Sequence, residues 1–274
     1  MIHILMSTYN GSQYIAEQIE SIISQTETEW LLYIRDDGST DDTRRIIEHY
    51  VQSDERIRLL PADGKNMRAM QSFIYLLENY GDADYIAFAD QDDVWEKNKL
   101  QVSIQTIRQA ELQYGQTTPI IVHCDLFVVD QQLNLISSSF WEYVNINPDL
   151  LDDNIHYLAI CNSITGCASL FNRAARNASL PITDKPFMHD AWMGLKVLDS
   201  GGKVVAIRQS LIRYRQHNDN VCGAQEYKFR LTNLKEKIRL AKRSYQTGHP
   251  LVFHNVLDFM WWKMRYFFAL HFRK

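Results

Sequence analysis

A short apolar segment that runs directly into three aspartates constrains the fold of this chain more than any other feature. Residues 85–89, YIAFA, have the length and the apolar, aromatic character of a buried β-strand. Asp90, Asp92 and Asp93 follow it within four positions. Ionised carboxylates this close together repel one another, so a strand that ends in them needs a nearby cation or another explanation.

Two interpretations of these aspartates are open. Asp93 and Glu96 have the spacing of a capping box, and residues 94–109 have a helical pattern that Asp93 would cap. Capping leaves Asp90 and Asp92 unexplained. In an extended chain these two side chains point the same way, and two hard oxygen ligands suit a divalent ion that also binds substrate phosphates. We therefore favour a metal site over capping alone.

The N-terminal part of the chain alternates between strand and helix patterns. Strands are expected at residues 2–7, 30–34, 57–60 and 85–89, with amphipathic helices between them. This order is typical of a parallel α/β sheet, in which ligands bind outside the carboxyl ends of the strands. Thr8, Asp36 and Asp37 fall at two of those ends. A dinucleotide site and a P-loop are excluded, because neither GxGxxG nor GxxxxGK[ST] occurs.

Charge is unevenly distributed along the chain. The 274 residues carry a net charge of −4, but residues 226–274 contain eleven Lys and Arg and three Asp and Glu. A basic end on an acidic body indicates an anionic partner, such as a membrane or a nucleic acid. The N-terminus lacks the features of a signal peptide, and no run of about 18 apolar residues occurs. A cytoplasmic protein without a membrane span is therefore expected.

Five motifs with chemical character follow one another along the chain. They are STYNG from Ser7, RDDGSTDDT from Arg35, FADQDDVW from Phe88, MHDAW from Met188 and YRQHNDN from Tyr214. Together they resemble a family 2 glycosyltransferase of the bacterial rhamnosyltransferase-like branch. The resemblance covers residues 2–223 and implies a GT-A catalytic domain over residues 1–223, a Rossmann-like mixed α/β sheet flanked by helices. Residues 224–274 would form a C-terminal basic and aromatic helical extension.

The resemblance also implies roles for particular residues. The nucleotide-sugar donor would bind Thr8, Tyr9, Asn10, Asp36, Asp37, Asn66, Asp90 and Gln91. Asp92 and His217 would hold a Mn²⁺ or Mg²⁺ ion at the diphosphate, and Asp190 would be the general base. The acceptor would meet Trp141, Thr165, Gly166 and Trp192. One position departs from the family pattern, because a loop that usually has Asn-x-Gly has Arg68 in place of the glycine.

The implied reaction is an inverting transfer of a sugar from dTDP-rhamnose or a UDP-hexose. The acceptor would be a hydroxyl of a bacterial surface polysaccharide, a glycan or a lipid-linked saccharide, and nucleic acid is not an expected partner. The diphosphate leaving group needs a Lewis acid, and the incoming hydroxyl needs one carboxylate base.

Other interpretations of the same residues stay open. Asp190 could instead be the N-cap of the helix that follows it, and His217 an ordinary histidine of the core or the surface. A nucleotidyltransferase is disfavoured, because residues 7–11 lack a Gly-rich loop with Arg and Lys. A catalytically silent partner subunit that binds nucleotide or glycan is the remaining alternative.

The C-terminal extension has two helical segments. Residues 227–245 carry apolar side chains at alternating spacings of four and three, which predicts a helix with one packing face. After Pro250, aromatic and basic residues are interspersed. This composition suits the interfacial zone of an anionic bilayer at the inner face of the cell membrane. Packing of both helices on the catalytic domain, or on a second copy in a homodimer, explains the pattern equally well.

Overall fold

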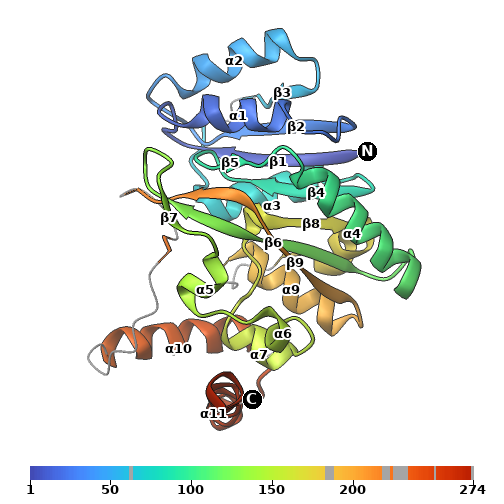
Figure 1. Cartoon of the computed structure of the whole chain (residues 1–274), viewed down its shortest axis with the longest axis vertical. Coiled ribbons are helices and arrows are strands. Elements are labelled where there is room, and N and C mark those ends of the chain that lie inside the picture. The colour runs from blue at the N-terminus through green and yellow to red at the C-terminus, as the bar shows by residue number, and fades with distance from the viewer. Residues whose placement is uncertain (62–63, 183–187, 218–222, 225–233, 250, 273–274) are drawn as a thin grey trace.

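The computed structural model describes all residues except 62–63, 183–187, 218–222, 225–233, 250 and 273–274. Its strands form a nine-stranded mixed sheet in the order β3-β2-β1-β4-β8-β6-β9-β5, with β7 paired to β6 (Figure 1). The strands are β1 Ile2–Thr8, β2 Trp30–Asp36, β3 Ile57–Leu59, β4 Tyr85–Ala89, β5 Val94–Trp95, β6 Ile120–Val129, β7 Leu135–Ser137, β8 Ser169–Asn172 and β9 Lys203–Arg215.

The four strands β1 to β4 are parallel, as the alternation of strand and helix patterns predicts. β1 lies between β2 and β4, and β2 pairs with β3. β8 then runs antiparallel to both β4 and β6, which makes the sheet mixed. The mixed α/β sheet flanked by helices that the resemblance implies is therefore confirmed.

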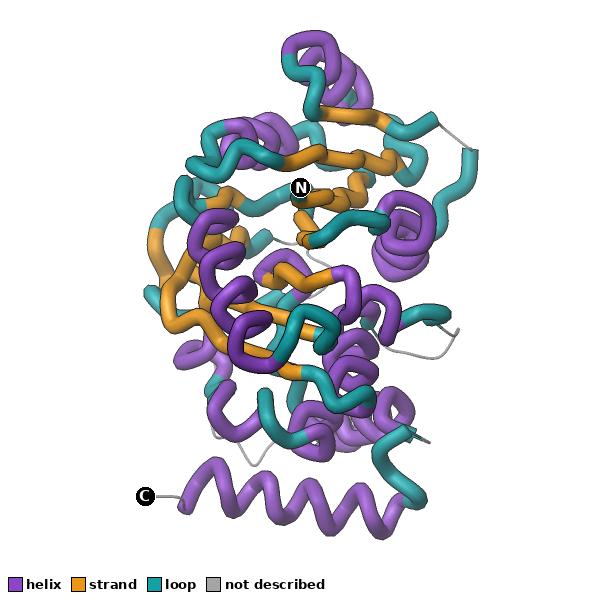
Figure 2. Tube along the Cα trace, turned by 90° about the vertical axis from the view of Figure 1, so that its right-hand side faces the viewer, coloured by secondary structure: helices purple, strands orange, loops and turns teal. Residues whose placement is uncertain are grey.

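Helices cover both faces of the sheet (Figure 2). They are α1 Ile15–Ile23, α2 Thr43–Ser53, α3 Arg68–Tyr80, α4 Lys99–Tyr114, α5 Phe140–Val144, α6 Pro148–Leu151, α7 Ile155–Ile160, α8 Arg173–Ser179, α9 His189–Asp199, α10 Leu234–Gly248 and α11 Val256–Phe272, with a 3-10 turn at Gly166–Ala168. Ile4 and Met6 of β1 pack with α1, α2 and α4, whereas Leu5 packs with α3 and α9 on the other face. Alternate side chains of a strand thus fill two separate cores.

The predicted helix over residues 94–109 is wrong at its beginning. Val94 and Trp95 form the short strand β5, which pairs with the distant strand β9, and α4 begins only at Lys99. The backbone N–H of Glu96 also donates to the carbonyl of Leu211 in β9, at 2.9 Å. Because these backbone groups bond to β9, they are not available to a helix, and Asp93 does not cap one.

The two C-terminal helices lie at the end of the molecule farthest from α2 (Figure 1). α11 packs on α7, where the ring of Trp262 stacks on His156 at a centroid distance of 3.8 Å and Tyr266 meets Tyr157 at 5.5 Å. Residues 227–233 of the first predicted helix lie outside the described residues. Within the described ranges, none of the helices combines the length and the hydropathy that a bilayer crossing needs. The division into 1–223 and 224–274 stays a prediction.

Candidate active site

The carboxyl ends of β1, β2 and β4 meet at one edge of the sheet, at the left of Figure 1. Thr8 lies opposite Asp36 in the register and donates to its Oδ1 at 3.4 Å. The side-chain amide of Gln91 bonds to both the N–H and the carbonyl of Tyr9, at 2.9 and 3.0 Å. A Cβ at Gly11 would lie 2.3 Å from Gln91 Oε1, so glycine is required for this contact. The residues assigned to the donor therefore tie the loops after β1 and β4 together.

Two asparagines assigned to the donor shape the surrounding loops. Asn10 accepts a hydrogen bond from the N–H of Thr40 at 2.8 Å, and Asn66 accepts one from the N–H of Arg68 at 3.2 Å. Arg68 has a φ of 65°, in the left-handed region that favours glycine. The position where the resemblance expects glycine thus keeps a glycine-like backbone although it carries an arginine.

Asp37 is buried and has its charge balanced within the protein. Its Oδ1 pairs with the guanidinium of Arg35 and accepts from the N–H of Met67 at 2.8 Å. Its Oδ2 accepts from the N–H of Arg68 at 2.7 Å. Only 2% of the Asp37 side chain is exposed, so this carboxylate holds the loop before α3 in place. Its predicted contact with a nucleotide stays a prediction.

The aspartates after β4 have a different environment. Asp92 lies beside His217, and Asp93 interacts with the buried ammonium of Lys99. Burial, followed by the nearby charge of Asp92, raises the pKa of Asp90 to about 7. Burial also raises the pKa of Asp93 well above its ordinary value. Asp93 accepts from the N–H of Arg215 at 3.2 Å, while its buried Oδ2 has no hydrogen-bond partner among the described residues. Carboxylates in this state have a strong tendency to bind a cation or a proton.

The end of β9 brings a histidine to this cluster. His217 Nε2 lies 2.8 Å from Asp92 Oδ2, and its ring lies 4.9 Å from that of Tyr14 in the loop before α1. Arg215, two residues earlier, is buried and donates to the carbonyl of Asp92 at 2.8 Å and to Glu17. The pair assigned to the metal is therefore assembled from segments 125 residues apart in sequence.

Asp190 lies in the first turn of α9. Its Oδ2 accepts from the N–H of Gly166 at 3.0 Å and its Oδ1 from the N–H of Ala191 at 2.6 Å. Burial raises its pKa to about 6. The N-cap of α9 is Met188, so the interpretation of Asp190 as the N-cap is wrong. The carboxylate is instead held by two backbone donors at the edge of the site.

The neighbouring His189 is a poor base. Its ring stacks on Phe73 at a centroid distance of 4.6 Å and meets Phe88 edge-on at 4.7 Å. Burial lowers its pKa to about 3, so it is neutral at physiological pH. A Cβ at Gly166 would lie 3.1 Å from its Nε2, so glycine lets the loop approach this ring. Asp190 is the better candidate for the base.

Only some of the residues assigned to the acceptor lie near Asp190, the candidate general base. Gly166 contacts Asp190 directly, and Thr165 precedes it. Trp192 donates its Nε1–H to the carbonyl of Ser179 at 3.0 Å. Trp141 is 5% exposed and meets His123 edge-on at 5.4 Å. The sugar contact proposed for the two tryptophans stays a prediction.

The side chains at this edge fit a divalent cation. Asp90, Asp93 and Cys167 each place one ligand atom within 4.8 Å of the others. Asp93 and Cys167 are buried and Asp90 is half-buried, and burial raises the pKa of both carboxylates. Asp92 and His217, the pair assigned to the metal, lie 2.8 Å apart and are not members of this three-residue group. Oxygen ligands with one imidazole suit Mn²⁺, and oxygen ligands suit Mg²⁺, whereas a thiol is too soft for either ion.

The sequence motifs missed two residues behind this cluster. Cys167 is buried beside Asp90 and Asp93. Lys99 is fully buried, with its Nζ 3.5 Å from the centroid of the Trp95 ring. Within the part of the chain that the structure describes, this Nζ has no hydrogen-bond partner. Burial lowers the pKa of Lys99 to about 8. The spacing of four residues between Trp95 and Lys99 can be read from the sequence, but the burial of Lys99 cannot.

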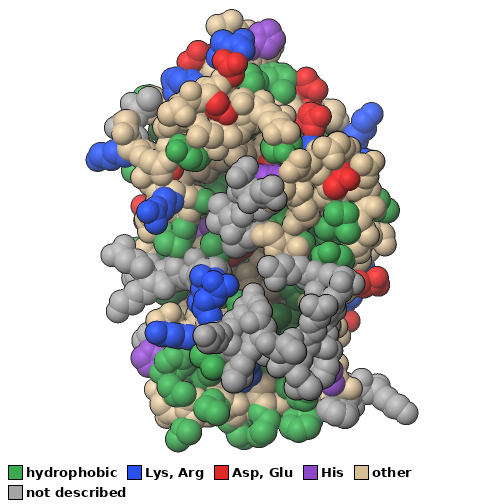
Figure 3. Space-filling view, turned by 90° about the vertical axis from the view of Figure 1, so that its left-hand side faces the viewer, with side chains coloured by type: hydrophobic (Ala, Val, Ile, Leu, Met, Phe, Trp, Pro, Cys, Tyr) green, Lys and Arg blue, Asp and Glu red, His purple; other side chains and the backbone are tan. Residues whose placement is uncertain are grey.

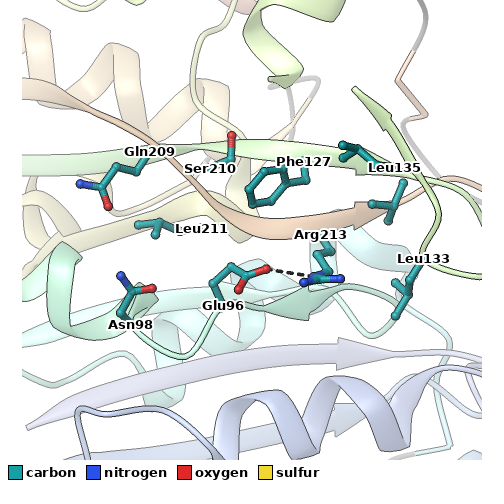
Figure 4. Close-up of a pocket in the computed structure, with 10 residues that line it drawn as sticks. Glu96, Asn98, Phe127, Leu133, Leu135, Gln209, Ser210, Leu211 and Arg213 are labelled. Atoms are coloured by element: carbon teal, nitrogen blue, oxygen red, sulfur yellow. Dashed lines mark hydrogen bonds and ion pairs between the residues drawn. The ribbon is translucent and has the colours of Figure 1, made fainter. Parts of the chain in front are cut away.

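A hollow of about 620 Å³ lies away from these residues, against β5, β6 and β9 (Figure 4). Phe127, Leu133 and Leu135 line it beside an ion pair between Glu96 and Arg213, with a distance of 2.9 Å between Oε1 and Nε. None of the residues assigned to donor, metal, base or acceptor borders it. It is separate from the candidate active site.

Comparison with known proteins identifies the family. The sequence model of glycosyl transferase family 2 matches residues 3–177. The chain belongs to this family. It is 24% identical to TuaG of Bacillus subtilis, named as a teichuronic acid biosynthesis glycosyltransferase, over 81% of both chains. It is 42% identical to RfbG of Shigella flexneri, a dTDP-rhamnosyl transferase, over 37% of this chain and 36% of that one. The predicted rhamnosyltransferase-like resemblance is thereby confirmed.

Solved structures of glycosyltransferases share the fold. The mannosyltransferase PcManGT from Pyrobaculum calidifontis, in complex with GDP-Man and Mn²⁺, superposes over 99% of this chain and 70% of its own, with a TM-score of 0.61 and 14% identity. S. aureus TarS 1-349 with UDP-GlcNAc superposes over 99% of this chain and 76% of its own, with a TM-score of 0.57 and 15% identity. These likenesses confirm the GT-A fold.

Proposed function

We propose that this family 2 glycosyltransferase transfers a sugar with inversion from a nucleoside diphosphate donor to a hydroxyl of a surface polysaccharide or a lipid-linked saccharide. The observation that carries the proposal is the placement of Asp190. This carboxylate has a raised pKa and lies near enough to Asp90, after β4, for its charge to raise the pKa of Asp90 as well. One base on one side and one site for a charged leaving group on the other suffice for a single displacement.

The protein's own residues account for the proton transfer. Asp190 accepts the proton of the acceptor hydroxyl, while the N–H groups of Gly166 and Ala191 hold its two oxygens in place. With a pKa of about 6, Asp190 is ionised at neutral pH and is a stronger base than an exposed aspartate. The acceptor oxygen bonds to the anomeric carbon as the carbon–oxygen bond to the diphosphate breaks, and the electron pair of that bond leaves with the diphosphate.

Asp92 and His217 would hold the cation, with Asp90 beside them. A bound Mn²⁺ or Mg²⁺ supplies Lewis-acid stabilisation of the charge that develops on the diphosphate. Thr8 and Asp36 at the ends of β1 and β2 would bind the nucleoside, and the loop closed by Gln91 would separate it from solvent.

The relatives indicate the class of donor and acceptor. RfbG is named for dTDP-rhamnose, and a third relative, WfgD of Escherichia coli, is named as a glucosyltransferase that takes UDP-Glc and a diphosphoundecaprenol acceptor. WfgD is 33% identical over 42% of this chain and 44% of its own. A dTDP- or UDP-linked hexose and a lipid-linked or polysaccharide acceptor are the substrates that these names support.

The test is release of nucleoside diphosphate from dTDP-rhamnose, UDP-glucose and UDP-galactose, with Mn²⁺, Mg²⁺ or EDTA and a membrane extract as acceptor. We expect turnover of one donor with metal and little in EDTA. Asp92→Ala should remove most of it, because the leaving group loses its stabilisation. Asp153→Ala, at an exposed aspartate, is the matched control and should keep full activity.

Full turnover in EDTA, or by the Asp92→Ala variant, would contradict the metal-dependent mechanism. Binding of a nucleoside diphosphate without turnover of any donor would favour the silent-subunit alternative.

A further inference from the structure

One face of α11 exposes a continuous apolar stripe. Its side chains are Val256, Leu257, Met260, Trp261, Met264, Phe267 and Phe268, with exposed fractions between 44% and 77%. They recur every three or four residues, so they share one side of the helix. Phe259 and Tyr266 on the opposite side are buried against the body of the protein. An exposed stripe of this size is unusual for a protein surface that contacts only water.

The stripe lies at an extremity of the molecule. In Figure 2, α11 runs along the lower end with the rest of the protein on one side of it, and Figure 3 shows hydrophobic side chains gathered at that end. The contact of Trp262 with His156 anchors the helix to α7. The exposed face is thus held on a fixed element, and a flat surface can reach all of it at once.

Two of the three side chains of α11 that carry a formal charge are cations. Lys263 and Arg265 are the two cations of α11, and Asp258 is its one acid. The Asp258 carboxylate accepts from the N–H of His254 at the beginning of the helix. The guanidinium of Arg265 lies over the rings of Trp261 and Trp262, at 4.8 and 5.2 Å from their centroids. Arg265 is exposed beside the apolar face, whereas Lys263 is half-buried, with its Nζ 5.5 Å from the centroid of the Phe259 ring. The two cations and one acid give α11 a net positive charge.

We propose that this stripe docks the protein on the surface of an anionic bilayer, with α11 lying in the plane of the membrane. Aromatic and aliphatic side chains would enter the boundary between headgroups and acyl chains, and the cations would meet lipid phosphates. α11 has 17 residues and a length of about 26 Å, and it lies on the bilayer rather than crossing it.

A second copy of the chain fits this face less well than a bilayer. A two-fold symmetric pairing buries the same patch of both copies, so two helices that each carry a net positive charge would share one interface. Like charges so placed repel one another. Anionic headgroups neutralise the same side chains, and charge complementarity therefore favours the membrane.

Docking on a membrane would bring the enzyme to a lipid-linked acceptor, and this benefit rests on the proposed function. The docking itself does not depend on that function. With α11 on the membrane, the edge that carries the candidate active site faces sideways, because it lies on a side of the molecule and not at its lower end (Figure 1). A lipid-linked saccharide in the same bilayer would approach along that side.

The test is flotation of the full chain with vesicles of phosphatidylglycerol and phosphatidylcholine, and with vesicles of phosphatidylcholine alone. We expect binding to the anionic vesicles that weakens as salt is added, since each cation near an anionic surface strengthens binding by about fivefold. The variant Leu257→Glu/Met264→Glu should bind about tenfold more weakly or worse, because it puts two carboxylates into the stripe. Leu112→Glu, at a leucine of α4 that is 84% exposed, is the matched control and should bind normally.

Leu257→Gln/Met264→Gln separates apolar insertion from charge, and it should also bind more weakly than the parent chain. Equal binding by the parent chain and the two double variants, or no binding by the parent chain, would overturn the proposal. Light scattering that shows a dimer which the double variants lose would assign the stripe to a second copy instead. None of these measurements involves a donor, so failure of docking and failure of the proposed transfer are distinguishable.

Discussion

The acids after β2 and the acids after β4 differ in what balances their charge. Asp37 has an arginine two residues earlier in the same strand region and accepts from two backbone N–H groups. Asp90 and Asp93 are crowded by Asp92, and their pKa values are raised. Asp37 is thus balanced by hydrogen-bonded groups of the protein, whereas the raised pKa values of Asp90 and Asp93 favour binding of a proton or a cation.

Two strand ends with similar sequences therefore have different electrostatic environments. RDDG and ADQDD both place aspartates at the edge of a parallel sheet, where a ligand is expected. The paired cluster stabilises a loop, because breaking a buried ion pair leaves an uncompensated charge. The cluster after β4 is the one that we propose binds a divalent ion and its diphosphate. Removing a carboxylate should thus reduce activity at the second site and stability at the first.

The largest effect is expected at the base. Asp190→Asn keeps the size of the side chain but cannot accept the proton of the acceptor, so transfer should fall by ~10²–10⁴-fold. Donor affinity, measured by calorimetry, should barely change, because the base faces the acceptor. A variant that binds donor poorly but transfers normally at saturation would show that Asp190 belongs to the donor site.

The pH profile provides an independent check of the same role. The pKa of Asp190 is about 6, so the rate should fall by about tenfold per pH unit below that value, as the carboxylate is protonated. Asp190→Asn should lose this acidic limb. An unchanged limb in the variant would assign it to another group, such as Asp90.

A smaller effect, on stability, is expected at the paired cluster. Asp37→Asn leaves the buried guanidinium of Arg35 without its carboxylate, and the free energy of unfolding should fall by about 3–5 kcal/mol. Urea denaturation measures the change. Asp42→Asn, which breaks an exposed pair with Arg45, is the control and should alter stability little. Equal effects of the two substitutions would mean that the buried pair is not the stabilising contact.

The sequence predicts the parts of this site that depend on local patterns. β1, β2, β3 and β4 occur where apolar runs predict them, and the acids fall at the expected edge. The helix predicted from residue 94 fails because the capping-box spacing is a local signal, whereas β5 pairs with a strand more than a hundred residues later. The burial of Lys99 and the approach of Cys167 to Asp90 likewise depend on contacts between distant segments. The extension beyond residue 223 was predicted to be helical, but its exposed stripe emerges only when the packed side of α11 is known.

The smallest expected effect concerns Arg68, whose N–H bonds to the paired carboxylate of Asp37. Its φ of 65° is costly for a residue with a Cβ, by about 1 kcal/mol relative to glycine. Arg68→Gly should therefore be more stable than Arg68→Ala by about that amount, as measured by urea denaturation. Both variants remove an exposed guanidinium from the donor edge, and both should weaken binding of nucleoside diphosphate by roughly tenfold. The two variants differ in backbone strain at residue 68, and both lose the charge of the guanidinium. A difference in stability between them, with equal affinities for nucleoside diphosphate, therefore separates the effect of strain from the effect of charge. If both variants bind nucleoside diphosphate as well as the parent chain does, Arg68 has no part in donor binding. The cluster around Asp37 would then stabilise the loop only, in contrast to the binding role that we propose for the acids after β4.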